Sequence, residues 1–334
     1  MRLATYNVEW FTSLFGDDDA LLMDDVWSSR HNVTRAQQAS ALGLVFQSLD
    51  ADAVLIIEAP DASSRRRTVT ALEAFAAHFN LRARTGVMGF MNDTQQEIAL
   101  LYDPDVLSAQ HKPRAGTASV PRFDGTFEID LDIDATRDKV QFSKPPLELG
   151  IETAAGTAFS LIGAHLKSKA PHGARNAAHA MKLAIANRRK QLAQAIWLRA
   201  RIDQLLEEGR SVVVMGDLND GPGLDEFEGL FGQSSLEIVL DGPGGALFDP
   251  HARQALSARL GAAPTSARFW IKQEKRYLQA LLDYVMVTAD IRQRNARWRI
   301  WHPLDDPDCW ADTALRDALV TASDHFPVTL DVDI

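Results

Sequence analysis

Residues 211–220 read SVVVMGDLND, in which an apolar run typical of a buried strand leads directly into a polar turn. Asp217 and Asn219 therefore stand at the end of a predicted strand. A rigid sheet presents such terminal side chains to a shared cleft, where binding and catalysis are concentrated. Polar residues at the ends of other predicted strands are therefore candidates for the same cleft.

Polar side chains stand at the ends of the other predicted strands as well. Residues 4–10, ATYNVEW, place Asn7 inside an otherwise strand-like run, although Asn is disfavoured in strands and costly to bury without partners. The complete set is Asn7, Glu58, His165, Asp217, Asn219, Asp283, Asp324 and His325. Taken singly, each is more often a cap, an ion-pair partner or a turn residue. Together they offer the carboxylate, amide and imidazole groups that hold a hard cation and a phosphate.

The composition is that of a folded protein with a large core. The 334 residues are 46% hydrophobic, and the formal net charge of -10 argues against simple adhesion to nucleic acid or anionic membrane, although local basic patches are not excluded. Cys309 has no second cysteine to pair with, the N-terminus lacks a secretory signal, and no apolar run approaches the roughly 20 residues of a membrane helix. We expect a soluble, cytoplasmic protein without stable membrane association.

Helix-like and strand-like segments alternate along the chain without an internal repeat. The predicted helices cover residues 34–49, 63–79 and 176–208, and the predicted strands cover 4–10, 53–58, 97–103, 127–133, 147–153, 158–166, 211–217, 280–287 and 326–334. Two irregular stretches, 16–31 and 241–264, are rich in turn-forming or acidic residues. We expect both to be loops or insertions.

The ordered motifs TYNVEWF, IIE, FSKPP, GAHLKSK, GDLND, LLDYV and SDHFPV resemble those of the endonuclease/exonuclease/phosphatase superfamily, which includes deoxyribonucleases, AP endonucleases, sphingomyelinases and inositol-polyphosphate phosphatases. The match runs from Asn7 to His325. The resemblance implies an α/β fold, a four-layer α/β sandwich of two mostly antiparallel sheets packed face to face with helices on the outside. It also implies a single domain over residues 1–334, with the site at one edge.

The resemblance implies a divalent cation at this edge. Glu58 matches the carboxylate that coordinates the ion, Asn7 matches an amide that helps to position the ion and its phosphate oxygen, and Asp324 would lie near them. Mg²⁺ or Mn²⁺ is expected, because an oxygen-rich ligand set without Cys or a dense histidine cluster suits hard ions better than zinc.

The remaining strand-end residues match the catalytic residues of the family. Asp217 would orient or deprotonate the attacking water, and Asn219 would bind a non-bridging phosphate oxygen. His325 matches the catalytic imidazole, and Asp283 matches the carboxylate that hydrogen-bonds it and fixes its tautomer. His165 matches a histidine that contacts the scissile phosphate or helps the leaving oxygen depart.

The sequence departs from the family pattern beside two of these residues. Ile57 precedes Glu58 where the family often has Gln, which keeps the ligand but removes a possible hydrogen bond to it. Leu282 precedes Asp283 where an Arg is common. The segment GAHLKSKAP lacks the Tyr and Asn of AP endonucleases, which argues against that specialised activity, and HLKSK instead resembles bacterial nucleases and broad phosphodiesterases.

The segment 166–202 contains nine Lys or Arg residues and no Asp or Glu, beside His165. We expect Lys167, Lys169 and Arg175 to contact flanking phosphates, with nucleic acid as the substrate partner; the alternative is a solvated helix face. The favoured function is therefore a Mg²⁺-dependent phosphodiesterase that cleaves DNA or RNA by in-line attack of water. The alternatives are a hydrolase of a small-molecule or lipid phosphoester and a catalytically silent binding module. No protein partner is indicated.

Overall fold

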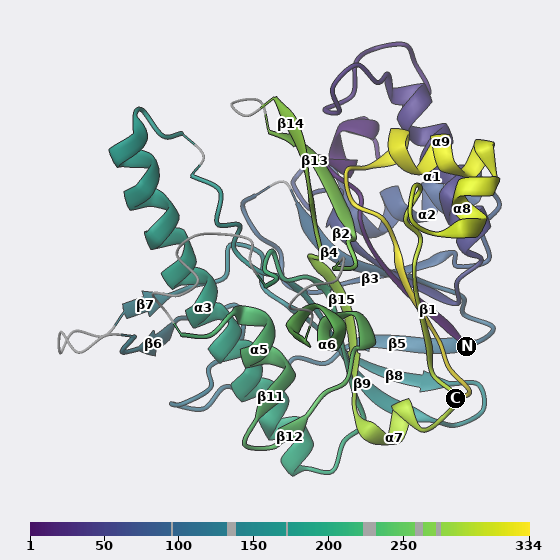
Figure 1. Cartoon of the computed structure of the whole chain (residues 1–334). Helices are drawn as coiled ribbons and strands as arrows, with labels where there is room; N and C mark the ends of the chain where they lie inside the picture. The colour runs from purple at the N-terminus through teal and green to yellow at the C-terminus, as the bar shows by residue number, and fades with distance from the viewer. Residues whose placement is uncertain (95, 132–137, 172, 223–231, 258–262, 272–274) are drawn as a thin grey trace.

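The computed structural model describes residues 1–94, 96–131, 138–171, 173–222, 232–257, 263–271 and 275–334. Two large β-sheets pack face to face, and helices cover the outer face of each sheet (Figure 1). The predicted four-layer α/β sandwich is confirmed. Within the described ranges, no helix combines the length and the apolar character needed to cross a membrane.

The first sheet has six strands. Their order is β16 (Arg297–Ile300), β17 (Val328–Asp331), β1 (Arg2–Asn7), β2 (Ala53–Ala59), β4 (Glu97–Tyr102) and β3 (Thr85–Met88). Only β1 and β2 pair in parallel, and α1 (Arg35–Leu49) connects them. Thr34 caps α1 in a reciprocal capping box with Gln37, which is why this helix begins where the sequence predicts it.

The second sheet has five strands. Their order is β15 (Asp283–Val287), β10 (Val212–Asp217), β9 (Ala158–His165), β8 (Leu147–Thr153) and β5 (Leu107–His111). Here β9 and β10 form the parallel pair, and the long helix α3 (Ala177–Glu207) connects them. Asn176 caps α3 by accepting the backbone N–H of His179. Both sheets are thus mostly antiparallel, as predicted.

The alternation of side chains along the strands builds three apolar layers. In β1, Leu3 points into the layer between the sheets, whereas Ala4 and Tyr6 point toward the helices outside. The outer helices of the first sheet are α1, α2 (Thr68–His78), α8 (Pro307–Ala311) and α9 (Thr313–Ala322). On the second sheet, Trp197 of α3 is fully buried against Phe123, Phe127 and Phe142.

Shorter elements complete the described chain. They are the 3-10 helix η1 (Phe11–Leu14), α5 (Ser235–Leu240), α6 (Pro250–Ser257), α7 (Ala289–Arg292), and the paired strands β6 (Phe127–Ile129) with β7 (Asp138–Val140), β11 (Asp241–Gly242) with β12 (Gly245–Ala246), and β13 (Ala267–Ile271) with β14 (Arg276–Ala280).

The prediction of an irregular loop over 241–264 is wrong for the part that is described. The segment contains the β11–β12 hairpin and α6, whose first turn is held by Asp249 through the backbone N–H groups of His251 and Ala252. α2 also begins later than predicted, at Thr68, because Ser63 forms a turn with the two residues Arg65 and Arg66. The predicted strand 127–133 is confirmed over 127–129, and residues 132–133 lie outside the described residues.

Candidate active site

The topology brings the polar strand ends to one edge of the sandwich. Since β1 and β2 are parallel, Asn7 and Glu58 lie at the same end of the first sheet. Since β9 and β10 are parallel, His165 and Asp217 are neighbours in register at the same end of the second sheet. β15 runs antiparallel to β10, so its first residue, Asp283, pairs with Asp217.

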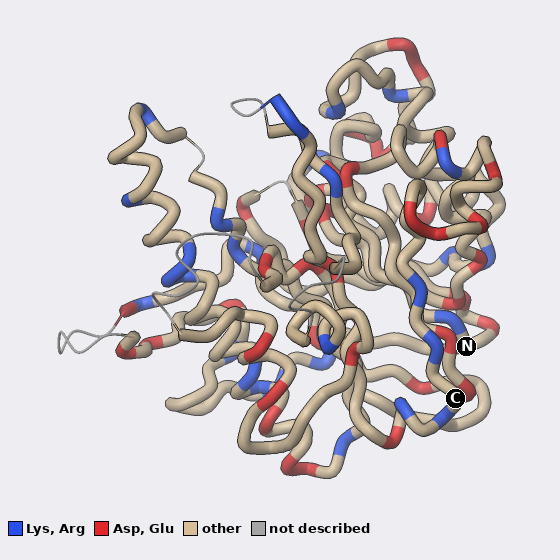
Figure 2. Tube along the Cα trace, viewed as in Figure 1, with Lys and Arg blue, Asp and Glu red and all other residues tan. Residues whose placement is uncertain are grey.

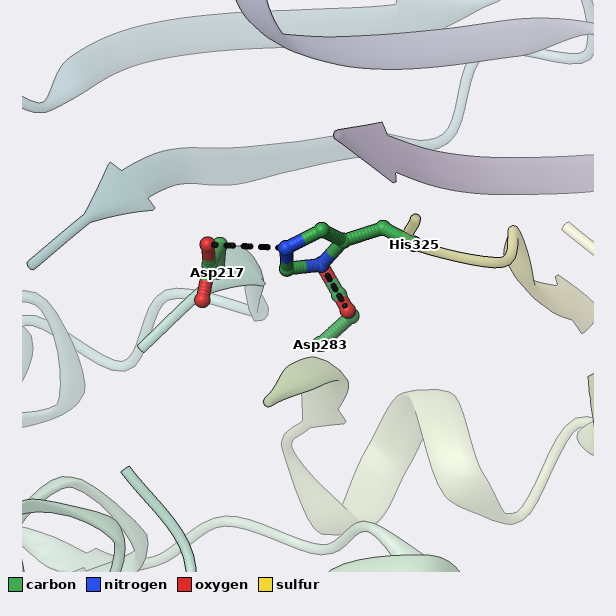
Figure 3. A group of neighbouring side chains, drawn as sticks. All are labelled: Asp217, Asp283 and His325. Carbon is green, nitrogen blue, oxygen red and sulfur yellow. Dashed lines mark hydrogen bonds and ion pairs between the residues drawn. The ribbon is translucent and has the colours of Figure 1, made fainter. Parts of the chain in front are cut away.

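His325 lies between two buried carboxylates. Its Nδ1 is 2.8 Å from Asp283 Oδ2, and its Nε2 is 3.9 Å from Asp217 Oδ2 (Figure 3). Ser266, whose role the sequence analysis missed, donates its hydroxyl to Asp283 Oδ2 at 2.8 Å and fixes that carboxylate. Burial alone would lower the pKa of His325, but Asp283, Asp217 and Asp324 outweigh burial and raise it to about 10. The imidazole is therefore positively charged at neutral pH.

Asp217 is a buried carboxylate surrounded by amides. It accepts the side-chain N–H of Asn7 at 3.0 Å and the backbone N–H of Asn219 at 2.8 Å. Burial raises the pKa of Asp217 to about 7, with nearby Asp283 acting in the same direction and His325 opposing it. This group can therefore both hold and release a proton near neutral pH.

His165 is buried beside Asp217 and a lysine. Its Nε2 lies 3.6 Å from Asp217 Oδ2, and its Nδ1 lies 3.3 Å from Nζ of Lys144. Burial, and then the charge of Lys144, lower the pKa of His165 well below its ordinary value, so the ring is neutral. Because the ammonium of Lys144 donates to Nδ1, the proton of His165 resides on Nε2, the atom facing Asp217. Lys144 stands in the FSKPP motif, yet we did not predict it as a site residue.

Glu58 is held in an unusual backbone conformation. Its φ of 62° lies in the left-handed region, at a bulge between Ile57 and Ala59 in the pairing of β2 with β4. Its Oε2 accepts the backbone N–H of Trp10 at 3.0 Å and the side-chain N–H of Gln96 at 2.6 Å. Gln96, directly before β4, thus supplies the hydrogen bond that Ile57 cannot supply.

The segment 16–31 places the side chain of Arg30 beside the sheet edge that carries the candidate site. Arg30 forms an ion pair with Glu9, and Glu9 also accepts the backbone N–H of Asp324 at 3.2 Å. Oδ1 of Asp324 lies 4.0 Å from Nε2 of His325. Through Arg30, the segment 16–31 therefore supports the residues at this edge of the sheets.

Two groups of residues offer oxygen ligands for a cation. Asp217, Asp283 and His325 lie close enough to share an ion, but His325 directs its two ring nitrogens to the two carboxylates, and its charge would repel a cation. Glu58 suits a cation better, because both of its described hydrogen bonds reach Oε2 and none from the described residues reaches Oε1. With Asn7 and Asp324 on the same cavity, this oxygen-rich set fits a hard divalent ion.

The candidate site borders a cavity of about 830 Å³ with two different sides. The polar strand-end residues that line it are Asn7, Glu58, His165, Asp217, Asn219, Asp324 and His325. Lys144, Lys167 and Arg188 contribute positive charge on one side. The other side is apolar, and its principal residues are Phe269, Ile271, Leu278 and Leu282. Of the neighbouring aromatic residues Phe269 and Trp270, Phe269 lines the cavity and Trp270 is half exposed, so Trp270 is not a core residue.

The three predicted phosphate-binding residues, Lys167, Lys169 and Arg175, differ in their position relative to the cavity. Lys167 lines the cavity. Lys169 also lines it, but its ammonium binds Oδ1 of buried Asp220 at 2.5 Å, and Arg188 lies 3.8 Å from the same oxygen. Arg175 is exposed before α3 and is absent from the described lining of the cavity.

Several charges of the basic segment 166–202 are compensated from elsewhere. Arg199 forms an ion pair with Asp203, and buried Arg201 lies 3.4 Å from Glu148 on β8. Arg189 binds Asp138 at 2.9 Å. The alternative of a wholly solvated helix face is wrong for this part of α3, because Arg188, Arg199 and Arg201 are buried.

The sequence of the chain shows its family. A model of the Endonuclease/Exonuclease/phosphatase family matches residues 4–325, and the chain belongs to this family. Members of the family are generally hydrolases that act on phosphoesters. No curated protein matches the chain in sequence.

Solved structures share the fold over nearly the whole chain. Truncated TDP2 from Caenorhabditis elegans is 13% identical, with 98% of this chain and 96% of that chain covered and a TM-score of 0.50. The endonuclease/exonuclease/phosphatase from Bacteroides vulgatus is 13% identical, with 99% and 98% covered and a TM-score of 0.51. TDP2 from D. rerio, solved with a single strand DNA product, is 11% identical, with 100% and 99% covered and a TM-score of 0.50. At these identities the likeness shows the fold.

Proposed function

We propose that this protein is a divalent-metal-dependent phosphodiesterase that cleaves DNA or RNA by in-line attack of water. The observation that carries the proposal is that Asp217 and His325, the latter held by buried Asp283, line a cavity with a basic side. A phosphodiester is anionic, so a site must neutralise its oxygens, align the water and stabilise the leaving oxygen. The chain offers a group for each task.

We assign the cation to Glu58, with Asn7 and Asp324 beside it, and we expect Mg²⁺ or Mn²⁺. When bound, the ion supplies positive charge to a non-bridging phosphate oxygen. Gln96 and the backbone of Trp10 hold Glu58 in place by binding one of its oxygens. The positive φ of Glu58 is then a local strain kept for the direction in which its carboxylate points.

Asp217 is the best candidate for the general base. Its pKa of about 7 allows it to take a proton from water at neutral pH, and Asn7 and Asn219 fix the carboxylate through their N–H groups. His325, kept charged by Asp283, directs Nε2 toward the same space and can donate to a phosphate oxygen. Neutral His165 presents its Nε2 proton nearby and can serve the phosphate or the leaving oxygen.

The charge around the cavity favours a polyanionic substrate. Lys and Arg lie along α3 and on β13 and β14, on two sides of the central edge (Figure 2). Lys144 and Lys167 serve the phosphate within the cavity, and Arg175 is left for a longer substrate. The DNA product bound by D. rerio TDP2 agrees with such a substrate.

A smaller or lipid phosphoester is the second candidate. The apolar side of the cavity, with Phe269 and Leu278, would accept an apolar leaving group as well as a nucleobase. A binding module without turnover is the third, and the presence of every expected catalytic side chain argues against it.

The test is a hydrolysis panel with Mg²⁺, Mn²⁺ or EDTA. Its substrates are supercoiled and linear DNA, single-stranded RNA, bis-p-nitrophenyl phosphate, p-nitrophenyl phosphate and sphingomyelin. We expect metal-dependent cleavage of nucleic acid that Asp217→Asn abolishes and that Asp203→Asn, which alters a carboxylate paired with Arg199 outside the cavity, retains. Turnover confined to the small or lipid esters would replace the nuclease by the second candidate, and no turnover of any substrate would contradict the enzyme.

A further inference from the structure

The β13–β14 ribbon has two faces of different character. It projects from the body of the sandwich (Figure 1), and Trp270 pairs with Tyr277 across it, as Phe269 pairs with Leu278. Because side chains alternate along each strand, Phe269, Ile271 and Leu278 line the cavity on one face. Arg268, Trp270 and Tyr277 belong to the opposite face, which we call the outer face of the ribbon.

The outer face carries two large exposed aromatic side chains and a stacked cation. Trp270 is 51% exposed and Tyr277 is 50% exposed, with their ring centroids 5.0 Å apart. The guanidinium of Arg268 lies 3.8 Å from the centre of the Tyr277 ring. In the described part of the chain, no carboxylate forms an ion pair with Arg268.

We propose that the outer face binds a single-stranded nucleic acid segment that continues out of the cavity, given the nuclease activity proposed above. Exposed aromatic rings accept any nucleobase by stacking, and adjacent cations hold the phosphates. The position supports this occupant, because the same two strands line the cavity with Phe269 and Leu278. A strand cleaved in the cavity therefore has the outer face within the reach of its next nucleotides.

The charge of the ribbon agrees with a polyanion and agrees less well with insertion into lipid. Lys275 and Arg276, the described residues at its far end, are exposed and charged, while Ile271 faces the cavity. Lys and Arg mark both strands of the ribbon (Figure 2). A lipid-inserting hairpin would instead direct apolar side chains outward at its end.

The experiment measures binding in the Asp217→Asn background, in which the oligonucleotide stays intact. Fluorescence anisotropy compares labelled oligothymidylates of about 20 and about three nucleotides, because single-strand sites span several bases. Trp270→Ala combined with Tyr277→Ala is expected to weaken binding of the longer strand at least about tenfold, as loss of base stacking does, and to leave the trimer within about twofold. Trp310→Ala is the matched control, because Trp310, on α8 and outside the ribbon, is 54% exposed and also stacks against an arginine, Arg316 of α9.

Three outcomes would overturn this assignment. They are unchanged binding of the longer strand, an equal loss in the Trp310→Ala control, and an equal loss for the trimer. Sedimentation with vesicles of phosphatidylcholine and phosphatidylserine tests a lipid occupant, and a loss of vesicle binding without a loss of strand binding would contradict the nucleic acid. The binding experiment does not depend on turnover. If the proposed hydrolase function is wrong, the unaltered chain will be inactive on the substrate panel, whatever the binding experiment shows.

Discussion

Replacing Asp283 by Asn tests whether a buried carboxylate keeps His325 charged. The rise of its pKa from 6.5 to about 10 corresponds to about 5 kcal/mol of preference for the charged imidazole, since each pKa unit is worth about 1.4 kcal/mol. Asp283 is the nearest of the three carboxylates that produce this rise, at 2.8 Å from Nδ1. If the substitution removes about half of this preference, the pKa of His325 falls to about 8.

The pH dependence of kcat/KM measures this change. We expect a profile that rises as Asp217 loses its proton near pH 7 and falls as His325 loses its proton near pH 10. At about pH 9, a pKa of about 8 lowers the charged fraction of His325 from about nine tenths to about one tenth, so kcat/KM falls about tenfold, against less than about twofold at pH 7.

Stability provides a second measurement with a defined sign. The folded-state pKa of His325 lies above 6.5, so its contribution to the free energy of unfolding is fully present below pH 6.5 and is lost as pH rises through about 10. The loss of stability caused by Asp283→Asn should therefore shrink as pH rises toward 10. A smaller, pH-independent cost remains, because the new amide places an N–H where Oδ1 has no partner among the described residues.

Ser266→Ala is the control for a merely structural effect. It keeps the carboxylate but removes the hydroxyl that binds Asp283 and accepts the backbone N–H groups of Leu282 and Asp283. We expect a loss of about 1–3 kcal/mol of stability with the alkaline limb still near pH 10. An alkaline limb that stays near 10 in Asp283→Asn, or that moves equally in Ser266→Ala, would refute the assignment of this limb to His325.

Three further changes separate the roles of other residues. Gln96→Leu should raise the Mg²⁺ concentration for half-maximal activity about 10- to 100-fold, because it releases Glu58 from a hydrogen bond; a metal titration of hydrolysis measures this, and an unchanged midpoint would contradict the metal assignment of Glu58. Lys144→Met should lower kcat about 10²-fold by freeing the tautomer of His165, with recovery in Lys144→Arg; equal activity in both variants would exclude this role. Trp197→Ala should lower the free energy of unfolding by about 3–5 kcal/mol in urea, since this side chain is fully buried, and a loss below about 1 kcal/mol would contradict that packing.

The fold was predictable because its local and long-range signals agree. Thr34 and Asn176 cap the helices that begin beside them, and the apolar alternation in β8 gives the bounds Leu147–Thr153 as predicted. The prediction for 241–264 failed because α6 has only eight residues, which is too short a window for apolar periodicity to distinguish a helix from a loop. Its first turn depends on Asp249, a residue that in sequence alone is indistinguishable from a loop aspartate.

The strand-end residues were predictable as a group, whereas their supporting contacts were not. Gln96 lies directly before β4 and donates to Glu58 of β2, and no local sequence pattern predicts a hydrogen bond between residues that only strand pairing brings together. Lys144 stands in a motif that the sequence analysis quoted, so its signal was present, but its distance to His165 depends on the folded chain. Contacts of this kind require register and burial, which composition and spacing do not contain.

The basic segment shows how burial changes the meaning of a charge pattern. All charged side chains between residues 166 and 202 are Lys or Arg. In the fold, however, Arg188 and Lys169 contact Asp220, and Arg201 contacts Glu148. Cations already paired within the fold release fewer counterions when nucleic acid binds. The affinity for nucleic acid should therefore depend less steeply on salt than nine free cations would predict. Stacking on the outer face of the β13–β14 ribbon supplies affinity of a kind that salt weakens little, so an acidic chain can hold a polyanion without a strongly basic surface.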